Sequence, residues 1–209
     1  MDVLTASEMY AYEQEVINHK KVPVLVLMEC AARAVVRQMK ERITSADKIL
    51  VVAGSGNNGG DGLAVGRILH NEGFEVTILE LGDPNQRSDQ NKRQHEIAQN
   101  YGVSLVSEIE RVSFNEFTIF VDALFGIGLS RKIEGTPLAV IQKINQLATK
   151  YVYAIDVPSG ISANEGTNIG TCLNSDETIT FGFHKFGMEK PGLKDVFGKI
   201  TIDDIGFFY

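Results

Sequence analysis

The segment KILVVAGSGNNGGDGLAVGRILHNEGFEVTILEL, from Lys48 to Leu81, constrains the fold of this 209-residue chain more than any other. It begins with an apolar, β-branched run, passes through a glycine-rich loop into a helical pattern, and ends in a second β-branched run. Gly54-Ser-Gly-Asn-Asn-Gly59 matches G-x-G-x-x-G in the strand–loop–helix setting that this pattern requires for phosphate binding. We therefore expect a nucleotide-binding β–α–β unit. The alternative is a glycine-rich turn that only lets a strand and a helix pack together.

The same alternation continues to the end of the chain. Patterns that predict strands lie at 49–53, 75–81, 104–106, 118–121, 152–155, 178–181 and 199–202, and helical patterns lie at 61–71, 88–101 and 137–148. Strands that alternate with helices predict a parallel sheet covered on both faces. We therefore expect one α/β domain spanning 1–209, with a three-layer, Rossmann-like, doubly wound and mostly parallel sheet. Because the last two strands lack a full helix between them, we expect them to form an added antiparallel edge.

Two helices are predicted before the sheet begins. Thr5-Ala-Ser-Glu8 is a capping box that opens a helix to about His19, and Pro23 opens a second helix to about Arg42. The start of the second helix, 22–28, is apolar on more than one face. This pattern indicates either a helix buried in its own core or one that also packs on a second subunit. We expect a homodimer formed through these helices.

Composition excludes several classes of function. The net charge is −7 and the pI about 5.1, which argues against a nucleic-acid partner and gives no sign of binding to an anionic membrane. The most apolar run, VPVLVLM, is far too short to span a bilayer, and the start of the chain lacks a signal-peptide pattern. With two cysteines and four scattered histidines, a disulfide framework and a zinc site are not expected. We expect a cytoplasmic protein.

The glycine loop contains more than a phosphate site needs. Asp61 is predicted to cap the following helix, but its charge would repel a pyrophosphate. Asn57 and Asn58 add amide groups that can bind a polar ligand or coordinate a hard cation. Glu80, at the end of the next strand, stands where a dinucleotide site places its ribose-binding acid.

Two later strands end in further polar residues. Asp122 ends one strand, and Asp156 ends the next, shortly before Ser159. In a doubly wound sheet of order 3-2-1-4-5, these strands lie beside the strand that feeds the glycine loop, and ligands bind at the carboxyl ends there. We expect these residues to converge with Asn57 and Asn58 on one crevice. Local turn capping is the alternative for each aspartate alone.

The motifs AGSGNNGGDGLAVGR, VDALFGIGLSR, AIDVPSGI and TFGFHKFGM together resemble the YjeF N-terminal domain family, the NAD(P)H-hydrate epimerases. The resemblance covers nearly the whole chain. It implies interconversion of the R and S epimers of hydrated NADH and NADPH (NADHX and NADPHX), with a potassium ion in the site. The family's substrate-binding positions fall here on Asn57, Asn58, Gly59, Gly60, Asp61, Gly126, Ile127, Gly128, Leu129, Ser130, Arg131, Lys132 and Asp156. Its potassium ligands fall on Asn58, Asp122 and Ser159.

The chain also departs from the family pattern. The late motif keeps Lys185 and its flanking glycines but lacks both prolines, which leaves a solvated surface lysine as the alternative to a functional one. Many relatives carry a C-terminal dehydratase domain that uses ADP or ATP. Since the chain ends at Tyr209, we expect that activity on a separate polypeptide.

The implied chemistry is inversion at C6 of a reduced nicotinamide to which water has been added. Either the ring nitrogen expels the C6 hydroxyl to give a planar iminium, or the N–C6 bond opens and recloses. Both routes need an acid and a base at the C6 oxygen. Asp122 and Asp156 offer this pair, and we predict both as catalytic residues, with Asp122 as the acid–base residue and Asp156 holding the substrate's polar groups. A potassium-binding role competes for Asp122. Arg131 and Lys132 either supply charge for the phosphates or belong to a solvated loop.

Two other functions remain open from the sequence. The glycine loop and Glu80 also fit an NAD(P)-dependent dehydrogenase, although no Tyr-x-x-x-Lys pair and no catalytic histidine near a strand end accompany them. A binding module or scaffold of the same fold that has lost catalysis is the second alternative. The intact GNNGGDG loop and Asp122 favour retained chemistry.

Overall fold

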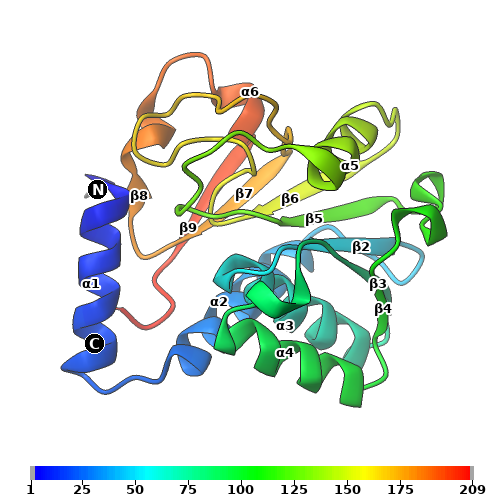
Figure 1. Ribbon diagram of the computed structural model, residues 1–209, viewed down its shortest axis with the longest axis horizontal. Helices are drawn as coiled ribbons and strands as arrows, with labels where there is room; N and C mark the ends of the chain where they lie inside the picture. The colour runs from blue at the N-terminus through cyan, green and yellow to red at the C-terminus, as the bar shows by residue number, and fades with distance from the viewer. Residues whose placement is uncertain (1–2, 208–209) are drawn as a thin grey trace.

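The computed structural model describes residues 3–207, in which one seven-stranded sheet lies between two layers of helices (Figure 1). The strands of this sheet are β2 (Lys48–Ala53), β3 (Glu75–Glu80), β4 (Ser104–Val106), β5 (Ile119–Ala123), β6 (Tyr151–Ile155), β7 (Glu177–Phe181) and β9 (Lys199–Asp203). The helices are α1 (Ala6–Asn18), α2 (Val24–Met39), α3 (Asn57–Asn71), α4 (Asp89–Asn100), α5 (Gly135–Asn145) and α6 (Lys194–Phe197). Two short strands, β1 (Val3–Leu4) and β8 (His184–Lys185), pair with each other, and short 3₁₀ turns lie at Pro84–Gln86, Ile109–Arg111, Phe114–Glu116 and Phe186–Glu189.

The strands are buried on both faces, which is why they read as continuous apolar runs. In β2, Ile49 and Val51 pack with the residues of α2 and α3, whereas Leu50 and Val52 pack with those of α5. This alternation follows from the two-residue period of a strand. In Figure 1, α2, α3 and α4 cover one face of the sheet and α5 covers the other. None of the helices between residues 3 and 207 has the length and apolar character needed to cross a bilayer.

The strand order is β4-β3-β2-β5-β6-β7-β9, and every neighbouring pair is parallel. The prediction of a doubly wound, mostly parallel sheet is therefore confirmed. The winding reverses between β2 and β5, so a crevice is expected outside their carboxyl ends.

The prediction of an antiparallel edge is wrong. β9 pairs with β7 in parallel, in the register from Glu177↔Lys199 to Phe181↔Asp203. Parallel neighbours need a crossover, and here residues 182–198 provide it through β8, a 3₁₀ turn and the four-residue helix α6. A crossover of short pieces leaves no helical periodicity in the sequence.

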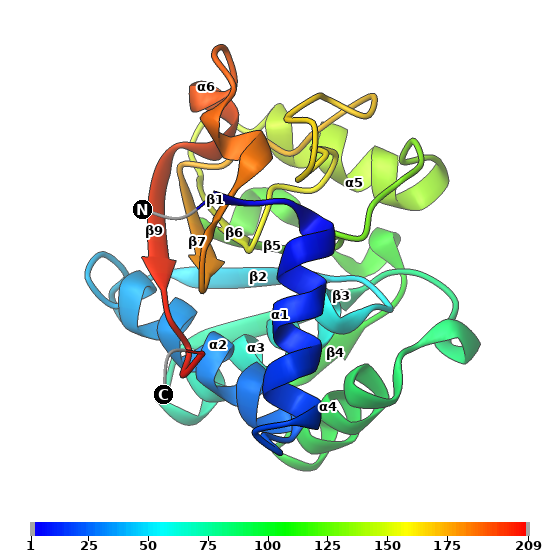
Figure 2. The same ribbon diagram turned by 90° about the vertical axis from the view of Figure 1, so that its left-hand side faces the viewer.

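The two N-terminal helices form as predicted, with small differences at their ends. The capping box is present, since the Glu8 amide donates to Thr5 Oγ1 at 3.2 Å and the Thr5 amide donates to Glu8 Oε2 at 2.8 Å. α1 does not join the helical layers but lies across the carboxyl ends of the strands, where Figure 2 shows it in front of the sheet. The Tyr12 hydroxyl donates to the Phe207 carbonyl at 3.0 Å, which ties α1 to the last described turn.

Candidate active site

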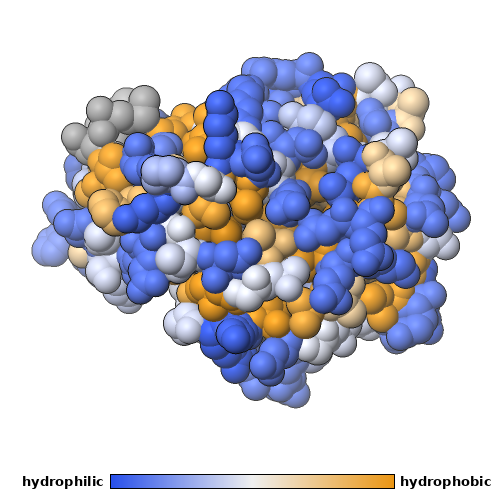
Figure 3. Space-filling view, turned by 90° about the horizontal axis from the view of Figure 1, so that it is seen from above, coloured by the Kyte–Doolittle hydropathy of each residue, from blue (hydrophilic) through white to orange (hydrophobic). Residues whose placement is uncertain are grey.

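A cleft of about 820 Å³ lies at the carboxyl ends of β2, β5 and β6. Its walls are α1, the first turns of α2, the glycine loop and the loop that follows β5. It is therefore the crevice that the strand order predicts, with α1 closing a side that the sheet leaves open. Seen from above, the molecule mixes hydrophilic and hydrophobic side chains and has no single continuous apolar face (Figure 3).

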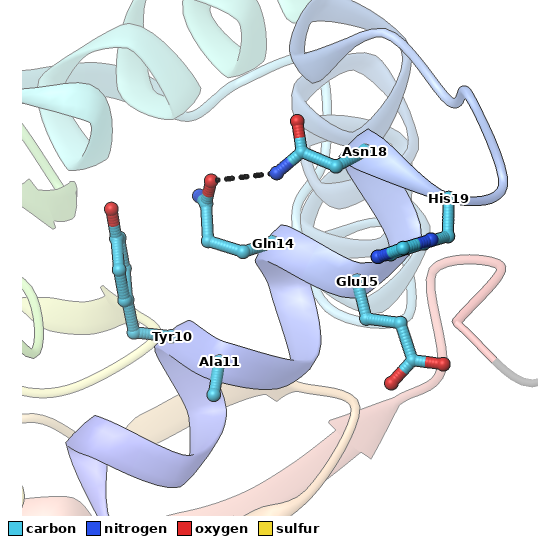
Figure 4. A pocket seen from close by; sticks show the side chains of 6 residues that line it. All are labelled: Tyr10, Ala11, Gln14, Glu15, Asn18 and His19. Atoms are coloured by element: carbon cyan, nitrogen blue, oxygen red, sulfur yellow. Dashed lines mark hydrogen bonds between the residues drawn. The ribbon is translucent and has the colours of Figure 1, made fainter.

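A second hollow, of about 530 Å³, lies along α1 and is shown in Figure 4. Its lining residues belong to α1 and to the C-cap residue that follows it, and are Tyr10, Ala11, Gln14, Glu15, Asn18 and His19. Because no other element lines it, this hollow is the surface of one helix and does not bring chemical groups together. The chemistry of the molecule lies in the larger cleft.

The glycines of the loop serve different purposes. A Cβ on Gly59 would lie 1.8 Å from the Gly54 carbonyl oxygen, and one on Gly54 would lie 2.1 Å from the Leu124 carbonyl oxygen. These two glycines therefore let backbone pack on backbone. Gly56 alone of the G-x-G-x-x-G glycines lines the cleft, and a Cβ there would meet no protein atom within 4 Å. Among these three glycines it is therefore the position where the backbone is open to a ligand.

The helix after the loop begins earlier than predicted. α3 starts at Asn57, with Gly56 as its N-cap, four residues before the predicted start at Asp61. The prediction that Asp61 caps this helix is therefore wrong, and Asp61 belongs to the second turn. The amides of the first turn remain free to face an anion, because no side chain caps them.

A buried clip holds the glycine loop in place. Asn91 is fully buried, and its Nδ2 donates to the carbonyls of Gly54 and Gly56, both at 2.9 Å. Its Oδ1 accepts from Arg87 Nη1 at 2.8 Å, and Arg87 also pairs with Glu80 at 2.7 Å.

Glu80 is not available to a ligand, which differs from its predicted place as a ribose-binding acid. Its Oε1 also contacts His95 Nδ1 at 2.8 Å, and its side chain is only 9% exposed. It does not line the cleft. Arg87 and His95 both contact the Glu80 carboxylate, which is therefore part of the clip.

Asp122 and Ser159 are fully buried beneath the cleft. Asp122 Oδ2 accepts from the Ser159 amide at 2.7 Å, and its Oδ1 accepts from Ser159 Oγ at 2.6 Å and the Leu124 amide at 3.2 Å. Burial raises the pKa of Asp122 to about 6, against the opposing effect of these hydrogen bonds. Neither residue lines the cleft, so the position of Asp122 does not favour direct proton transfer to a substrate.

Asn58 fits a cation site, because it lies against Gly126, and the amide of the preceding Phe125 donates to Ser159 Oγ at 3.0 Å. A Cβ on Gly126 would lie 3.4 Å from Asn58 Oδ1, so the absence of a side chain there makes room for the amide. Asn58 Nδ2 is buried without a hydrogen-bond partner, and turning the amide over would place its oxygen at that point. Amide, hydroxyl and carboxylate oxygens are hard donors, which suits potassium. Across residues 3–207, no three His, Cys, Asp or Glu side chains form a metal-binding cluster.

Asp156 reaches the cleft from a strained turn. Its φ is +68°, in the left-handed region that aspartate tolerates better than most residues. Its Oδ1 lies 2.7 Å from Lys185 Nζ and accepts from Thr180 Oγ1 at 3.0 Å. Lys185 is 1% exposed and also donates to Thr180 Oγ1 and to the Phe181 carbonyl. The surface-lysine interpretation of Lys185 is therefore wrong.

Asp61 and Glu13 face the same cleft from α3 and α1. Burial raises the pKa of Asp61 well above its usual value, and repulsion from Asp156 and Glu13 adds to this effect. Burial likewise raises the pKa of Glu13, with repulsion from Asp156, while Lys185 opposes the increase. The cleft thus gathers acidic groups that retain protons more strongly than carboxyls in water.

The structure brings only part of the predicted site to the cleft surface. The predicted residues that line it are Asn57, Asn58, Asp61, Gly126, Ile127, Gly128, Leu129, Ser130, Arg131 and Asp156. Those that lie outside its lining are Gly59, Gly60, Asp122, Lys132 and Ser159. Sequence reasoning missed Glu13 and Lys185 as members of the cleft. The sequence signals were weak, because α1 contains no site motif and the motif around Lys185 departs from the family pattern.

The family model described as YjeF-related protein N-terminus matches residues 24–187. The chain belongs to this family. An NAD(P)H-hydrate epimerase of Limosilactobacillus reuteri is 40% identical over 208 residues, covering 99% of this chain and 97% of its own length. One of Weissella koreensis is 41% identical over 208 residues, covering 99% of this chain and 92% of its own length.

A solved structure shows the same fold. The crystal structure of yeast ynu0 matches with a TM-score of 0.78 at 21% identity, covering 97% of this chain and 87% of the yeast chain. The resemblance drawn from the sequence motifs is thus confirmed for both family and fold.

Proposed function

We propose that this chain is an NAD(P)H-hydrate epimerase, an isomerase that interconverts the R and S epimers of NADHX and NADPHX. The observation that carries the proposal is that the GNNGGDG loop, the loop after β5 and Asp156 face one cleft, in a chain about 40% identical to proteins of that name over almost its full length. The substrate is thus a nicotinamide nucleotide hydrated at C6.

The cleft suggests how such a substrate lies. Gly56 and the uncapped first turn of α3 form the anion site, with the exposed Arg131 facing the same cleft. The hydrated ring then lies at the end of the cleft where Asp61 and Asp156 are found. Glu80 gives no support to a dehydrogenase, because the clip occupies it.

Epimer separation tests the function. Purified protein incubated with (R)-NADPHX is expected to produce the S epimer faster than a buffer control on a column that resolves the two. An absorbance change at 340 nm with NADP⁺ and simple alcohols would instead indicate the dehydrogenase. Tight nucleotide binding without turnover would indicate a scaffold that has lost catalysis.

We further propose that Asn58, Asp122 and Ser159 hold a potassium ion. When bound, the ion supplies positive charge beside the loop of Gly126, where it favours polar groups of the substrate. The buried Asn58 amide nitrogen without a partner supports this proposal.

Potassium is therefore expected to stabilise the protein in the absence of substrate. A ligand at 100 times its dissociation constant contributes about 2.7 kcal/mol, which is several degrees in melting temperature for a chain of this size. The comparison is thermal unfolding in potassium chloride and in tetramethylammonium chloride of equal concentration. Asn58→Ala should abolish the difference, and an equal melting temperature of the wild type in both salts would contradict the proposal.

Finally, we propose a cytoplasmic homodimer that works with a separate ATP- or ADP-dependent dehydratase. Leu25 and Val26 at the start of α2 are 36% and 48% exposed, as expected for residues that pack on a second copy. A monomeric mass by light scattering at micromolar concentration would contradict the dimer.

A further inference from the structure

Four charged side chains from four separate segments come together in the cleft. Glu13 comes from α1, Asp61 from α3, Asp156 from the turn after β6 and Lys185 from β8, and all four line the cleft. Their possible charges are three negative and one positive. Lys185 is already committed to Asp156, at 2.7 Å. The one cation of this group is therefore paired with Asp156, and neither Glu13 nor Asp61 forms an ion pair with it.

Asp61 is the member of this group best placed to carry a proton. Within residues 3–207 its carboxyl makes no hydrogen bond or ion pair, so no protein group fixes its orientation. Burial and repulsion from Asp156 and Glu13 raise its pKa, and both effects favour the neutral acid. The other ionisable groups of the cleft lining are Tyr10, on α1, and the exposed Arg131.

Asp122, unlike Asp61, has hydrogen-bond donors from the protein on both of its carboxylate oxygens. Both of its oxygens accept hydrogen bonds from Ser159, and it is fully buried outside the lining of the cleft. A group in this position can hold a cation or a loop, but it cannot reach a substrate oxygen without breaking those bonds.

On the basis of the proposed function, we propose that Asp61 gives and retakes the proton at the C6 oxygen of the hydrated nicotinamide. Glu13 acts as a positioning residue that keeps this proton on Asp61. The role of α1 is thus to supply the negative charge of Glu13, which favours the protonated form of Asp61 on α3.

The step balances without any other reactant. Asp61 donates its proton to the C6 hydroxyl, and the C6–O bond breaks so that its electron pair leaves with water. The lone pair of the ring nitrogen forms the N–C6 double bond at the same time. Water then adds to the opposite face of the planar iminium, the double-bond electrons return to nitrogen, and the Asp61 carboxylate takes back one proton. The net change is inversion at C6.

The pH dependence of the rate separates this role of Glu13 from a structural one. Because the acid must be protonated, the rate falls as the pH rises through the pKa of Asp61. Glu13→Gln removes a repelling charge, so ionised Asp61 becomes more favourable and the falling limb should move down by about one pH unit. Glu15→Gln is the matched control, because it removes the same charge from α1 but lines only the other hollow (Figure 4). An unchanged limb in Glu13→Gln would overturn the role of Glu13.

Asp61→Asn tests the acid itself. It should lower kcat by about 10² to 10⁴ while NADPHX still binds. If the wild type interconverts the epimers and Asp61→Asn retains more than a tenth of the wild-type kcat, the role of Asp61 is overturned but the proposed function is not. A wild type without epimerase activity would overturn the proposed function, and the role of Asp61 with it.

A measurement on the wild-type protein does not depend on the folding of any variant. Carboxyl ¹³C shifts followed over pH report the titration of Asp61 directly. We expect its midpoint above the ordinary value of an aspartate, lower in Glu13→Gln than in the wild type and unchanged in Glu15→Gln. A midpoint of Asp61 at the ordinary value of about 4 would overturn the proposal whatever the activity of the enzyme.

Discussion

Gly59→Val is expected to destroy the nucleotide site and to lower the free energy of unfolding by about 3 kcal/mol or more. The cause is internal to the protein. Even the first side-chain atom would lie 1.8 Å from the Gly54 carbonyl oxygen, 2.6 Å from its carbon and 2.9 Å from Asn91 Nδ2. Two backbone segments and the buried clip would have to separate. Thermal unfolding and calorimetric titration with NADPHX measure the two effects.

Gly56→Ala is the matched control, because the added methyl group meets no protein atom within 4 Å. It should cost less than about 1 kcal/mol of stability at this N-cap position. If a phosphate group rests on this part of the loop, binding should nevertheless weaken about tenfold. A Gly59→Val variant that folds and binds as tightly as the wild type would contradict the packing of the loop. A Gly56→Ala variant with unchanged affinity would contradict the position assigned to the phosphates.

Asp122→Asn is expected to abolish most activity at ordinary potassium concentration. The replacement keeps one oxygen as an acceptor, but its NH₂ group then faces a backbone amide donor, that of Ser159 in one orientation and that of Leu124 in the other. A buried donor without an acceptor costs about 1 to 3 kcal/mol, so the variant should also unfold at a lower temperature. Activity and melting temperature should be measured over a range of potassium concentrations.

The potassium dependence decides between the two roles considered for Asp122. If it is a ligand of the ion and a support of the loop, high potassium should restore activity. If it is instead the acid–base residue predicted from the sequence, the rate should remain lower by about 10² or more at any potassium concentration. The buried position of Asp122 leads us to expect restoration. Full turnover at ordinary potassium would contradict both roles.

The layout of the sheet could be predicted because its determinants are local. Double-sided burial of strands such as 49–53 gives apolar runs, and the glycine loop marks where strand changes to helix. The boundary at Asn57 was less predictable. Gly59 and Gly60 normally argue against a helix, whereas here the close packing of Gly59 on the Gly54 backbone requires a glycine inside one. The parallel edge of β9 depends on an irregular crossover that has no periodic signal.

The convergence of the loop residues with Asp156 could be predicted from strand order alone. Whether each side chain is buried or lines the cleft could not be predicted, because a position at a strand end does not tell whether a carboxylate faces a cleft or a buried serine. Asp122 and Asp61 differ in this respect. That Glu13 and Lys185 line the cleft could not be predicted from the sequence for another reason. Their membership depends on α1 lying across the sheet and on β8 pairing with β1, which are contacts between distant parts of the chain.

The most direct test of the account is an approach to equilibrium from both sides. Pure (R)-NADPHX and pure (S)-NADPHX should be incubated separately with the wild-type protein and with Asp61→Asn, beside a buffer control, and the epimers resolved by chromatography. The account predicts that the wild type brings both samples rapidly to the same epimer ratio, whereas Asp61→Asn is slower by about 10² or more. Convergence no faster with the wild type than in buffer would contradict the assignment of this cleft to epimerisation at C6.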